Sequence, residues 1–113
     1  MKNVRISDFC MKYGVKKRSV DYWTNLGLIH PNVNPRNGYR DYGEIAEEEV
    51  KDILLVQVIN DGKVTKAEIA KLDDYTKEKW RDAVLSKISD AYSANRDRFD
   101  LILNHANERI ERS

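Results

Sequence analysis

The fold of this chain is decided by residues 6–42, ISDFCMKYGVKKRSVDYWTNLGLIHPNVNPRNGYRDY. The apolar residues in the first part of this stretch recur at helical spacing: Ile6, Phe9, Cys10 and Tyr13. Ser7 is a good N-cap because its hydroxyl can accept a hydrogen bond from the first turn, and Gly14 can adopt the positive φ that a helix C-terminus favours. This part therefore predicts a short helix capped by Ser7 and closed by Gly14.

A second helix pattern follows in residues 16–27, KKRSVDYWTNLG. Val20, Trp23 and Leu26 lie on one side of this pattern, and the basic residues at its start lie mostly off that side. Gly27 closes the helix. Two short helices joined at a glycine-containing turn are typical of a helix-turn-helix.

The next segment predicts a β-hairpin. Residues 28–30 form a short extended run that stops at Pro31, and the Asn37–Gly38 pair is a strong signal for a hairpin turn. Residues 39–42 supply a returning strand in which aromatic and charged side chains alternate. A basic helix followed by such a hairpin predicts a winged helix-turn-helix.

These residues also carry a family resemblance. The run V-x-x-R-S-V-x-Y-W-x-x-L-G-L-I over residues 15–29, a proline at position 31 and N-G-Y-R-x-Y over residues 37–42 resemble the DNA-binding domain of the MerR family of bacterial regulators. Two spaced motifs match in the right order, and the likeness covers roughly the first two-fifths of the chain closely. The resemblance implies a dimer that bends or twists a promoter with an overlong spacer, so that RNA polymerase can engage it.

The resemblance also implies which residues contact DNA. Arg18 matches an arginine, and Tyr22 an aromatic residue, that the family uses on DNA, and the lysines at the helix start suit phosphate binding. In the hairpin, it implies contacts with the backbone or the minor groove. The residues expected to bind DNA are Lys16, Lys17, Arg18, Asp21, Tyr22, Arg36, Asn37, Tyr39 and Arg40. A solvated basic turn is the alternative for the first three.

Asp21 departs from the family pattern, because many members have an arginine at this position. An acidic side chain repels phosphate but can accept a hydrogen bond from cytosine N4. Asp21 therefore either recognises a base or marks weakened binding. The aromatic residues Trp23 and Tyr42 are expected to pack instead, Trp23 in the core and Tyr42 between the hairpin and the domain.

The distribution of charge supports a phosphate-binding first segment. The formal net charge is +1, so global basicity does not point to nucleic acid. Residues 1–40, however, hold eight Lys/Arg and two Asp, whereas residues 41–61 hold one Lys and seven Asp/Glu. A positive segment followed by an acidic one is expected if one face of the protein meets phosphate.

After the hairpin, the apolar residues of segment 44–62 follow no single period, and their β-branched content would also suit a strand. We expect a largely buried helix that ends near Gly62, because the family pattern has a helix here and the glutamates suit its first turn. Thr65 and Glu68 then form a capping box that opens a further short helix.

From about Lys77 the chain contains no Gly or Pro, and an apolar stripe recurs every three or four residues. The stripe predicts one long amphipathic helix that needs a partner helix, most simply its copy in a second subunit. The family resemblance implies that the two helices pair antiparallel, whereas the stripe itself leaves a parallel pair open. The residues expected in this dimer interface are Trp80, Val84, Ile88, Ala91, Asn95, Phe99, Ile102, Ala106 and Ile110. The alternative is that the chain folds back near residues 93–95 into a helical hairpin within one subunit.

The expected fold class is therefore mainly α. Residues 1–75 are expected to form a MerR-like winged helix-turn-helix DNA-binding domain that includes two further helices. Residues 76–113 are expected to form the long C-terminal dimerisation helix, with no separate effector domain.

The sequence shows no residue pattern typical of a disulfide, a metal site, a cofactor site or a catalytic site. Cys10 is the single cysteine and is expected to be a buried thiol, so an internal disulfide is excluded. His30 and His105 lie far apart without a Cys or His cluster, so we expect no metal, and no cofactor or small-molecule ligand is evident. Because catalytic motifs are not visible, we do not expect an enzyme. The lack of a secretory leader or a membrane-length apolar run favours the cytoplasm.

Three functions fit these residues. The first is a sequence-specific transcription regulator that binds double-stranded DNA as a homodimer on a (pseudo)palindromic promoter site. The second is an architectural or recombination-directionality (excisionase-like) protein of a mobile element, which bends or bridges DNA without controlling polymerase. The third is an interaction protein whose winged domain has drifted from DNA, a function that Asp21 alone favours.

Overall fold

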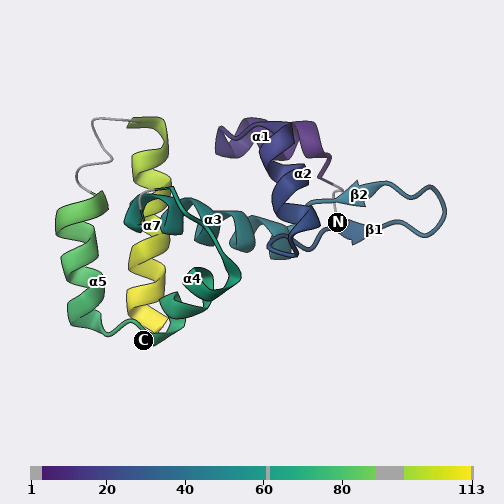
Figure 1. Ribbon diagram of the computed structural model, residues 1–113. Helices are drawn as coiled ribbons and strands as arrows, with labels where there is room; N and C mark the ends of the chain where they lie inside the picture. The colour runs from purple at the N-terminus through teal and green to yellow at the C-terminus, as the bar shows by residue number, and fades with distance from the viewer. Residues whose placement is uncertain (1–3, 61, 89–95, 113) are drawn as a thin grey trace. The chain divides into compact units, whose positions relative to one another are not determined.

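The computed structural model describes residues 4–60, 62–88 and 96–112, and their secondary structure is mainly helical, as predicted (Figure 1). The chain divides into two compact units, Met1–Val50 and Lys51–Ser113. The boundary lies inside helix α3 (Glu44–Ile59), so this helix contributes residues to both units. Within the described residues, no helix combines the length and the apolar character that a membrane span needs.

The first unit begins with two short helices, α1 (Ile6–Tyr13) and α2 (Lys17–Asn25). Gly14 follows α1 with φ 63°, and Gly27 follows the end of α2 with φ 77°. Both glycines occupy the left-handed region, which other residues adopt at a cost of roughly 1–2 kcal/mol. The helix-turn-helix expected in this stretch is confirmed.

The expected N-cap of α1 is wrong. The cap residue is Arg5, and Ser7 lies inside the first turn. The chain before the helix is held by the end of the hairpin and the residue after it, since the Val4 N–H donates to Asp41 Oδ1 at 2.6 Å and the Tyr42 N–H donates to the Val4 carbonyl at 2.9 Å. With residue 4 held in this way, α1 begins two residues earlier than a cap at Ser7 would allow.

The hairpin consists of two short strands. β1 (Asn32–Val33) pairs antiparallel with β2 (Arg40–Asp41), with Val33 opposite Arg40. The first strand therefore lies after Pro31 and not in residues 28–30, where the buried side chains of Leu28 and Ile29 belong to the core.

The tip of the hairpin is shaped by asparagine side chains and one glycine. Gly38 has φ +72°, and its N–H donates to the Asn34 carbonyl at 2.8 Å. Asn37 Oδ1 accepts a hydrogen bond from the Tyr39 N–H at 2.9 Å, and the Asn34 N–H donates to the Tyr39 carbonyl at 2.9 Å. The turn predicted at Asn37–Gly38 is confirmed.

An aromatic cluster forms the centre of the first unit. The ring of fully buried Phe9 lies 5.2 Å from that of Tyr13 and 5.0 Å from that of Tyr42, measured between centroids. Aromatic contacts at such distances add about 0.5–1.5 kcal/mol beyond the burial of area. Trp23 is buried as well, so the packing roles expected for Trp23 and Tyr42 are confirmed.

Helix α3 lies where the sequence predicted a largely buried helix. The polar contacts of its first half within the first unit include Lys12 Nζ to Glu47 Oε1 at 2.7 Å and the His30 ring Nδ1 to Glu49 Oε2 at 2.5 Å. After the helix, Gly62 has φ 92° and donates its N–H to the Gln57 carbonyl at 2.8 Å. The expected end of the helix near Gly62 is confirmed.

The second unit continues with α4 (Lys66–Lys71), the short 3₁₀ helix η1 (Leu72–Asp74) and α5 (Lys77–Ala83). The N-cap of α4 is Thr65, whose hydroxyl accepts from the Glu68 N–H at 3.1 Å, so this half of the predicted capping box is confirmed. The π-helix η2 (Val84–Ile88) extends α5, and α7 (Arg96–Arg112) is the last helix.

The prediction of one continuous C-terminal helix is wrong. Both α5 and η2 pack against α7, and the helices lie side by side in Figure 1. A straight helix would separate residues 83 and 96 by about 20 Å along its axis, which excludes such contacts. The packing agrees with the fold-back alternative, although residues 93–95, where the fold-back was expected, lie outside the described residues.

The packing of α5 and η2 against α7 explains why the chain does not form one continuous C-terminal helix, because it gives the apolar stripe a partner within the same chain. Trp80, Ile102 and Ala106 are buried and so are already covered by their own subunit. Ile110 is half-buried. Of the other residues expected in a dimer interface, Val84 and Ile88 lie in η2 and Phe99 in α7, whereas Ala91 and Asn95 lie outside the described residues.

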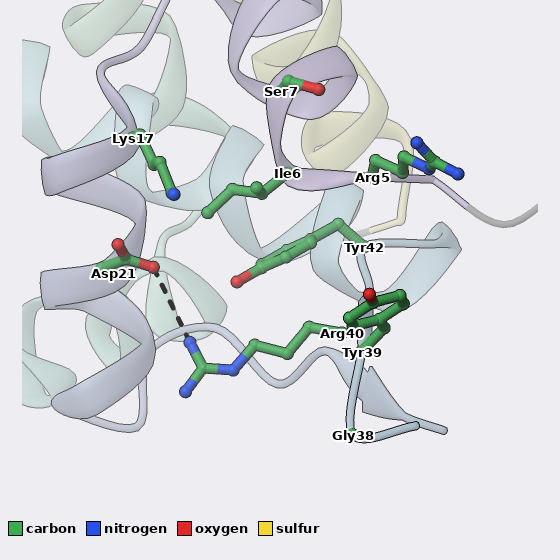
Figure 2. A pocket seen from close by; sticks show the side chains of 9 residues that line it. All are labelled: Arg5, Ile6, Ser7, Lys17, Asp21, Gly38, Tyr39, Arg40 and Tyr42. Atoms are coloured by element: carbon green, nitrogen blue, oxygen red, sulfur yellow. Dashed lines mark ion pairs between the residues drawn. The ribbon is translucent and has the colours of Figure 1, made fainter. Parts of the chain in front are cut away.

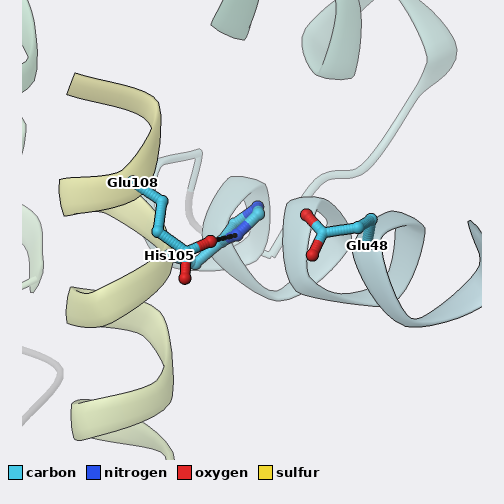
Figure 3. Close-up of side chains that lie close together, drawn as sticks. All are labelled: Glu48, His105 and Glu108. Carbon is cyan, nitrogen blue, oxygen red and sulfur yellow. Dashed lines mark ion pairs between the residues drawn. The ribbon is translucent and has the colours of Figure 1, made fainter. Parts of the chain in front are cut away.

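A buried charged network also holds α7 in the second unit. His105 Nε2 donates to Asp52 Oδ1 at 2.5 Å, and Arg109 binds the same carboxylate through Nε at 3.0 Å and Nη2 at 2.7 Å. Arg109 Nη1 also donates to Asp73 Oδ1 at 2.8 Å. On α7 itself, His105 Nδ1 lies 3.8 Å from Glu108 Oε2 (Figure 3). The sequence did not predict this network.

Candidate nucleic-acid interface

All residues predicted to bind DNA belong to the first unit. Five lie on α2 or at its N-cap: Lys16, Lys17, Arg18, Asp21 and Tyr22. Four lie on the hairpin: Arg36, Asn37, Tyr39 and Arg40. All of them are exposed except Asp21, which is half-buried. The two groups are therefore accessible to a large ligand such as a nucleic acid.

A cavity of about 560 Å³ joins these two groups (Figure 2). Four of the predicted residues line it: Lys17, Asp21, Tyr39 and Arg40. Five further residues complete the lining: Arg5, Ile6, Ser7, Gly38 and Tyr42. The start of α1, one face of α2 and the returning arm of the hairpin thus share one hollow surface.

The charges around the cavity are mainly positive. Its lining includes the cations Arg5, Lys17 and Arg40, and Asp21 is the one acid among the lining residues. Arg40 Nη1 lies 3.7 Å from Asp21 Oδ1, and each of these side chains is 43% exposed. Figure 2 shows the Arg40 side chain reaching from the hairpin toward Asp21 on α2. This arrangement of cations can bind an anion.

Local structure explains why these side chains meet. Lys17 and Asp21 are four residues apart on α2, a spacing that places two side chains on the same face of a helix. Arg40 begins β2, directly after the turn that Gly38 makes possible, and the buried Tyr42 follows two residues later. The packing of Tyr42 on Phe9 therefore helps to place the hairpin arm beside α2.

The remaining predicted residues do not line the cavity. Lys16, Arg18 and Tyr22 are exposed on α2 or at its start, and Arg36 is exposed in the hairpin loop. The Asn37 side-chain oxygen accepts the Tyr39 N–H, so this side chain shapes the turn.

Arg5 and Ser7 were not singled out for this surface. Arg5 was visible as a cation in the basic first segment, but about 30 residues separate it from the hairpin arm that shares its cavity. Only tertiary structure brings the two segments together. The signal that could have included Arg5 is its charge, and for Ser7 we see none.

Asp21 also affects the single cysteine. Cys10 is half-buried, and burial raises the pKa of its thiol, with the negative charge of Asp21 raising it further and Lys17 opposing the change. The thiol therefore remains protonated at neutral pH, which is the unreactive form. This agrees with the expected structural role, although Cys10 is less buried than predicted.

Comparison with known proteins identifies the class to which this fold and surface belong. Residues 4–76 match the MerR HTH family of regulatory proteins, a match that covers more than half of the chain. The chain belongs to this family, as the two sequence motifs predicted.

A particular relative supports the same class. Over 42 residues the chain is 52% identical to the HTH-type transcriptional regulator CueR of Bacillus subtilis (strain 168). The matched stretch is 37% of this chain and 29% of CueR, so the chain spans less than a third of that relative's length. No solved structure shows a significant match. The family match and this relative thus agree on the same class, a helix-turn-helix regulatory protein.

Proposed function

We propose that this chain is a sequence-specific regulator of transcription that binds double-stranded DNA in the cytoplasm. It acts as a homodimer on a (pseudo)palindromic promoter site, and it bends or twists the DNA so that RNA polymerase can engage. The observation that carries the proposal is the exposed cationic surface that α2 and the hairpin share in one compact unit.

The exposed side chains of this surface suit two kinds of DNA contact. A recognition helix lies in the major groove, where contacts from its exposed side chains to the flanking phosphates position it, and α2 offers Lys17, Arg18 and Tyr22 for such contacts. Hairpin residues such as Arg36 and Arg40 can then hold phosphates of the adjacent backbone. Each cation that neutralises a phosphate releases counterions, which makes affinity fall with salt.

Arg18→Ala and Arg40→Ala test the contacts directly. Each substitution should weaken binding to all sequences alike and lower the salt slope by about one unit for each lost phosphate contact. Fluorescence anisotropy with a labelled duplex at several salt concentrations measures both quantities. Lys63→Ala removes an exposed cation outside the first unit and should leave both unchanged. Unchanged binding in the Arg18/Arg40 double variant would refute the DNA-contact assignment.

The kind of site bound distinguishes a regulator from an architectural protein. Mapping of the bound DNA across the genome should find single palindromic promoter sites for a regulator. Tandem sites at a recombination end would favour the architectural function instead. Transcription in vitro from a mapped promoter, with and without the protein, then tests whether RNA polymerase responds.

The homodimer rests on the need for two recognition helices at a palindromic site, about 34–36 Å or a multiple apart along the DNA. Because Trp80, Ile102 and Ala106 are covered by their own chain, a partner would use other residues of the second unit. Leu85 is a candidate, since this apolar side chain is 68% exposed. Sedimentation velocity at micromolar concentration should show a dimer, and Leu85→Asp should shift it toward monomer. A monomeric unmodified protein would refute the dimer.

A further inference from the structure

Asp21 has a specific partner in the structure. Its carboxylate faces the Arg40 guanidinium across the cavity, and this contact links α2 to the hairpin (Figure 2). A side chain placed to recognise a base would be expected to extend from α2 without such an internal partner. The ion pair therefore gives Asp21 a third possible role, in addition to base recognition and simple repulsion.

We propose that Asp21 is an internal competitor of DNA for Arg40. In the protein without DNA, the Asp21 carboxylate takes the place of a backbone phosphodiester at the Arg40 guanidinium, and binding exchanges one anion for the other. This proposal rests on the DNA binding proposed above. It makes Asp21 a residue that sets affinity through Arg40, without reading sequence.

The geometry makes this exchange easy. The distance of 3.7 Å is longer than the 2.7–2.9 Å typical of a charge-assisted hydrogen bond, so the pair leaves the donors of Arg40 incompletely used. Both side chains are 43% exposed, and pairs of such exposure are weak because water and salt screen them. A phosphodiester can accept two parallel hydrogen bonds from a guanidinium, which the longer contact with Asp21 does not provide.

The surroundings favour the incoming phosphate. Lys17 lines the same cavity and lies one helical turn from Asp21, so a phosphate at Arg40 would have a second cation on the same face of α2. Until it arrives, the carboxylate keeps the Arg40 side chain directed toward α2. Because every backbone phosphate has the same charge, the competition lowers affinity for specific and random DNA alike.

A double-mutant cycle isolates this effect. The unmodified protein, Asp21→Asn, Arg40→Gln and the double variant are titrated with an operator duplex and a random duplex over a range of salt. Asp21→Asn should tighten binding to both duplexes about twofold to fivefold at low salt, the range expected for an exposed ion pair. It should also raise the salt slope by up to about one, because Arg40 engages a phosphate fully.

The decisive expectation is that the gain from Asp21→Asn disappears in the Arg40→Gln background. An equal gain in both backgrounds would show direct repulsion of phosphate and overturn the proposal. An altered preference at a single base pair would show base recognition and overturn it as well. Glu44→Gln removes a negative charge, and Arg36→Gln a positive one, from the same unit outside the cavity, so neither should reproduce the coupling.

A measurement without DNA separates this inference from the proposed function. In nuclear magnetic resonance spectra of the DNA-free protein, the Arg40 Nε–H signal should move on Asp21→Asn and stay in place on Glu44→Gln. If the protein binds DNA but this signal does not move, the competition is overturned while the proposed function stands. If the signal moves but no variant binds any duplex, the proposed function is overturned, and the exchange with DNA falls with it.

Discussion

The two units of this chain use charge in opposite ways. In the first unit, Asp21 and Arg40 meet at 3.7 Å with their side chains 43% exposed. In the second, Asp52 binds His105 and Arg109 at 2.5–3.0 Å, and the three side chains are largely buried. Water and salt screen the exposed pair, whereas the largely buried network has little solvent to replace a lost partner. If the proposed function holds, charge serves binding in the first unit and packing in the second.

Removal of Asp52 should have the largest effect of the changes considered. Asp52→Ala leaves the Arg109 guanidinium and the His105 ring buried without their shared acceptor, and such a loss typically destabilises by about 3–5 kcal/mol. Urea unfolding followed by circular dichroism measures the free energy of unfolding. The matched control is Asp73→Ala, which removes the second acceptor of Arg109. Because the Asp73 side chain is 76% exposed, this substitution should lower the free energy of unfolding by less than about 1 kcal/mol. Equal losses of unfolding free energy in Asp52→Ala and Asp73→Ala would contradict the difference expected between buried and exposed charge.

Acid should weaken the same network, and the loss of unfolding free energy should be smaller than that caused by Asp52→Ala. Burial alone would raise the pKa of Asp52, but hydrogen bonds from His105 and Arg109 outweigh burial and lower the pKa below its usual 3.8. The stabilisation is therefore complete above the unfolded-state pKa and is lost as pH falls through the lower folded-state pKa. Between pH 6 and pH 3, the difference in unfolding free energy between the unmodified protein and Asp52→Asn should shrink below about pH 4. Parallel pH curves would contradict this.

A smaller effect than the loss of Asp52 is expected at the hairpin tip. A Cβ at Gly38 would meet nothing within 4 Å, so Gly38→Ala should cost the strain of φ +72° alone, about 1–2 kcal/mol. Gly38→Asn should cost less, because asparagine tolerates the left-handed region. Thermal unfolding ranks the two variants. Their DNA affinities should follow the same order, since the cavity is lined by Gly38 and the two residues after it.

Several local features of the fold could be predicted from the sequence, although the N-cap expected at Ser7 was wrong. The turns at Gly14, Gly27 and Asn37–Gly38, and the cap at Thr65, each depend on a few neighbouring residues whose chemistry determines the backbone. The aromatic positions at the hairpin's end were recognisable for the same reason. The family was recognisable because two such local motifs occur in order.

The non-local features could not be predicted. Whether α5 pairs with α7 or with a second subunit depends on free energies of alternative packings, and the periodicity of the stripe is the same in both. The cavity joins Arg5 to residues more than thirty positions away. Asp52 and His105 are 53 residues apart, although an acid within an apolar stretch and a His–Arg pair at helical spacing were visible signals. The DNA-contact residues themselves remain predictions.

The double contact of His30 with Glu49 has a consequence for hydrogen exchange. The His30 N–H donates to Glu49 Oε1 at 2.8 Å, and the ring Nδ1 lies 2.5 Å from Oε2 of the same carboxylate. His30 itself is exposed in the connection between α2 and β1, and the amides of exposed connections usually exchange quickly. Because its acceptor is carried by α3, the His30 amide can exchange only when this contact opens. Its protection should therefore report how often the Glu49 side chain releases His30, which makes a loop residue a probe of a contact with α3.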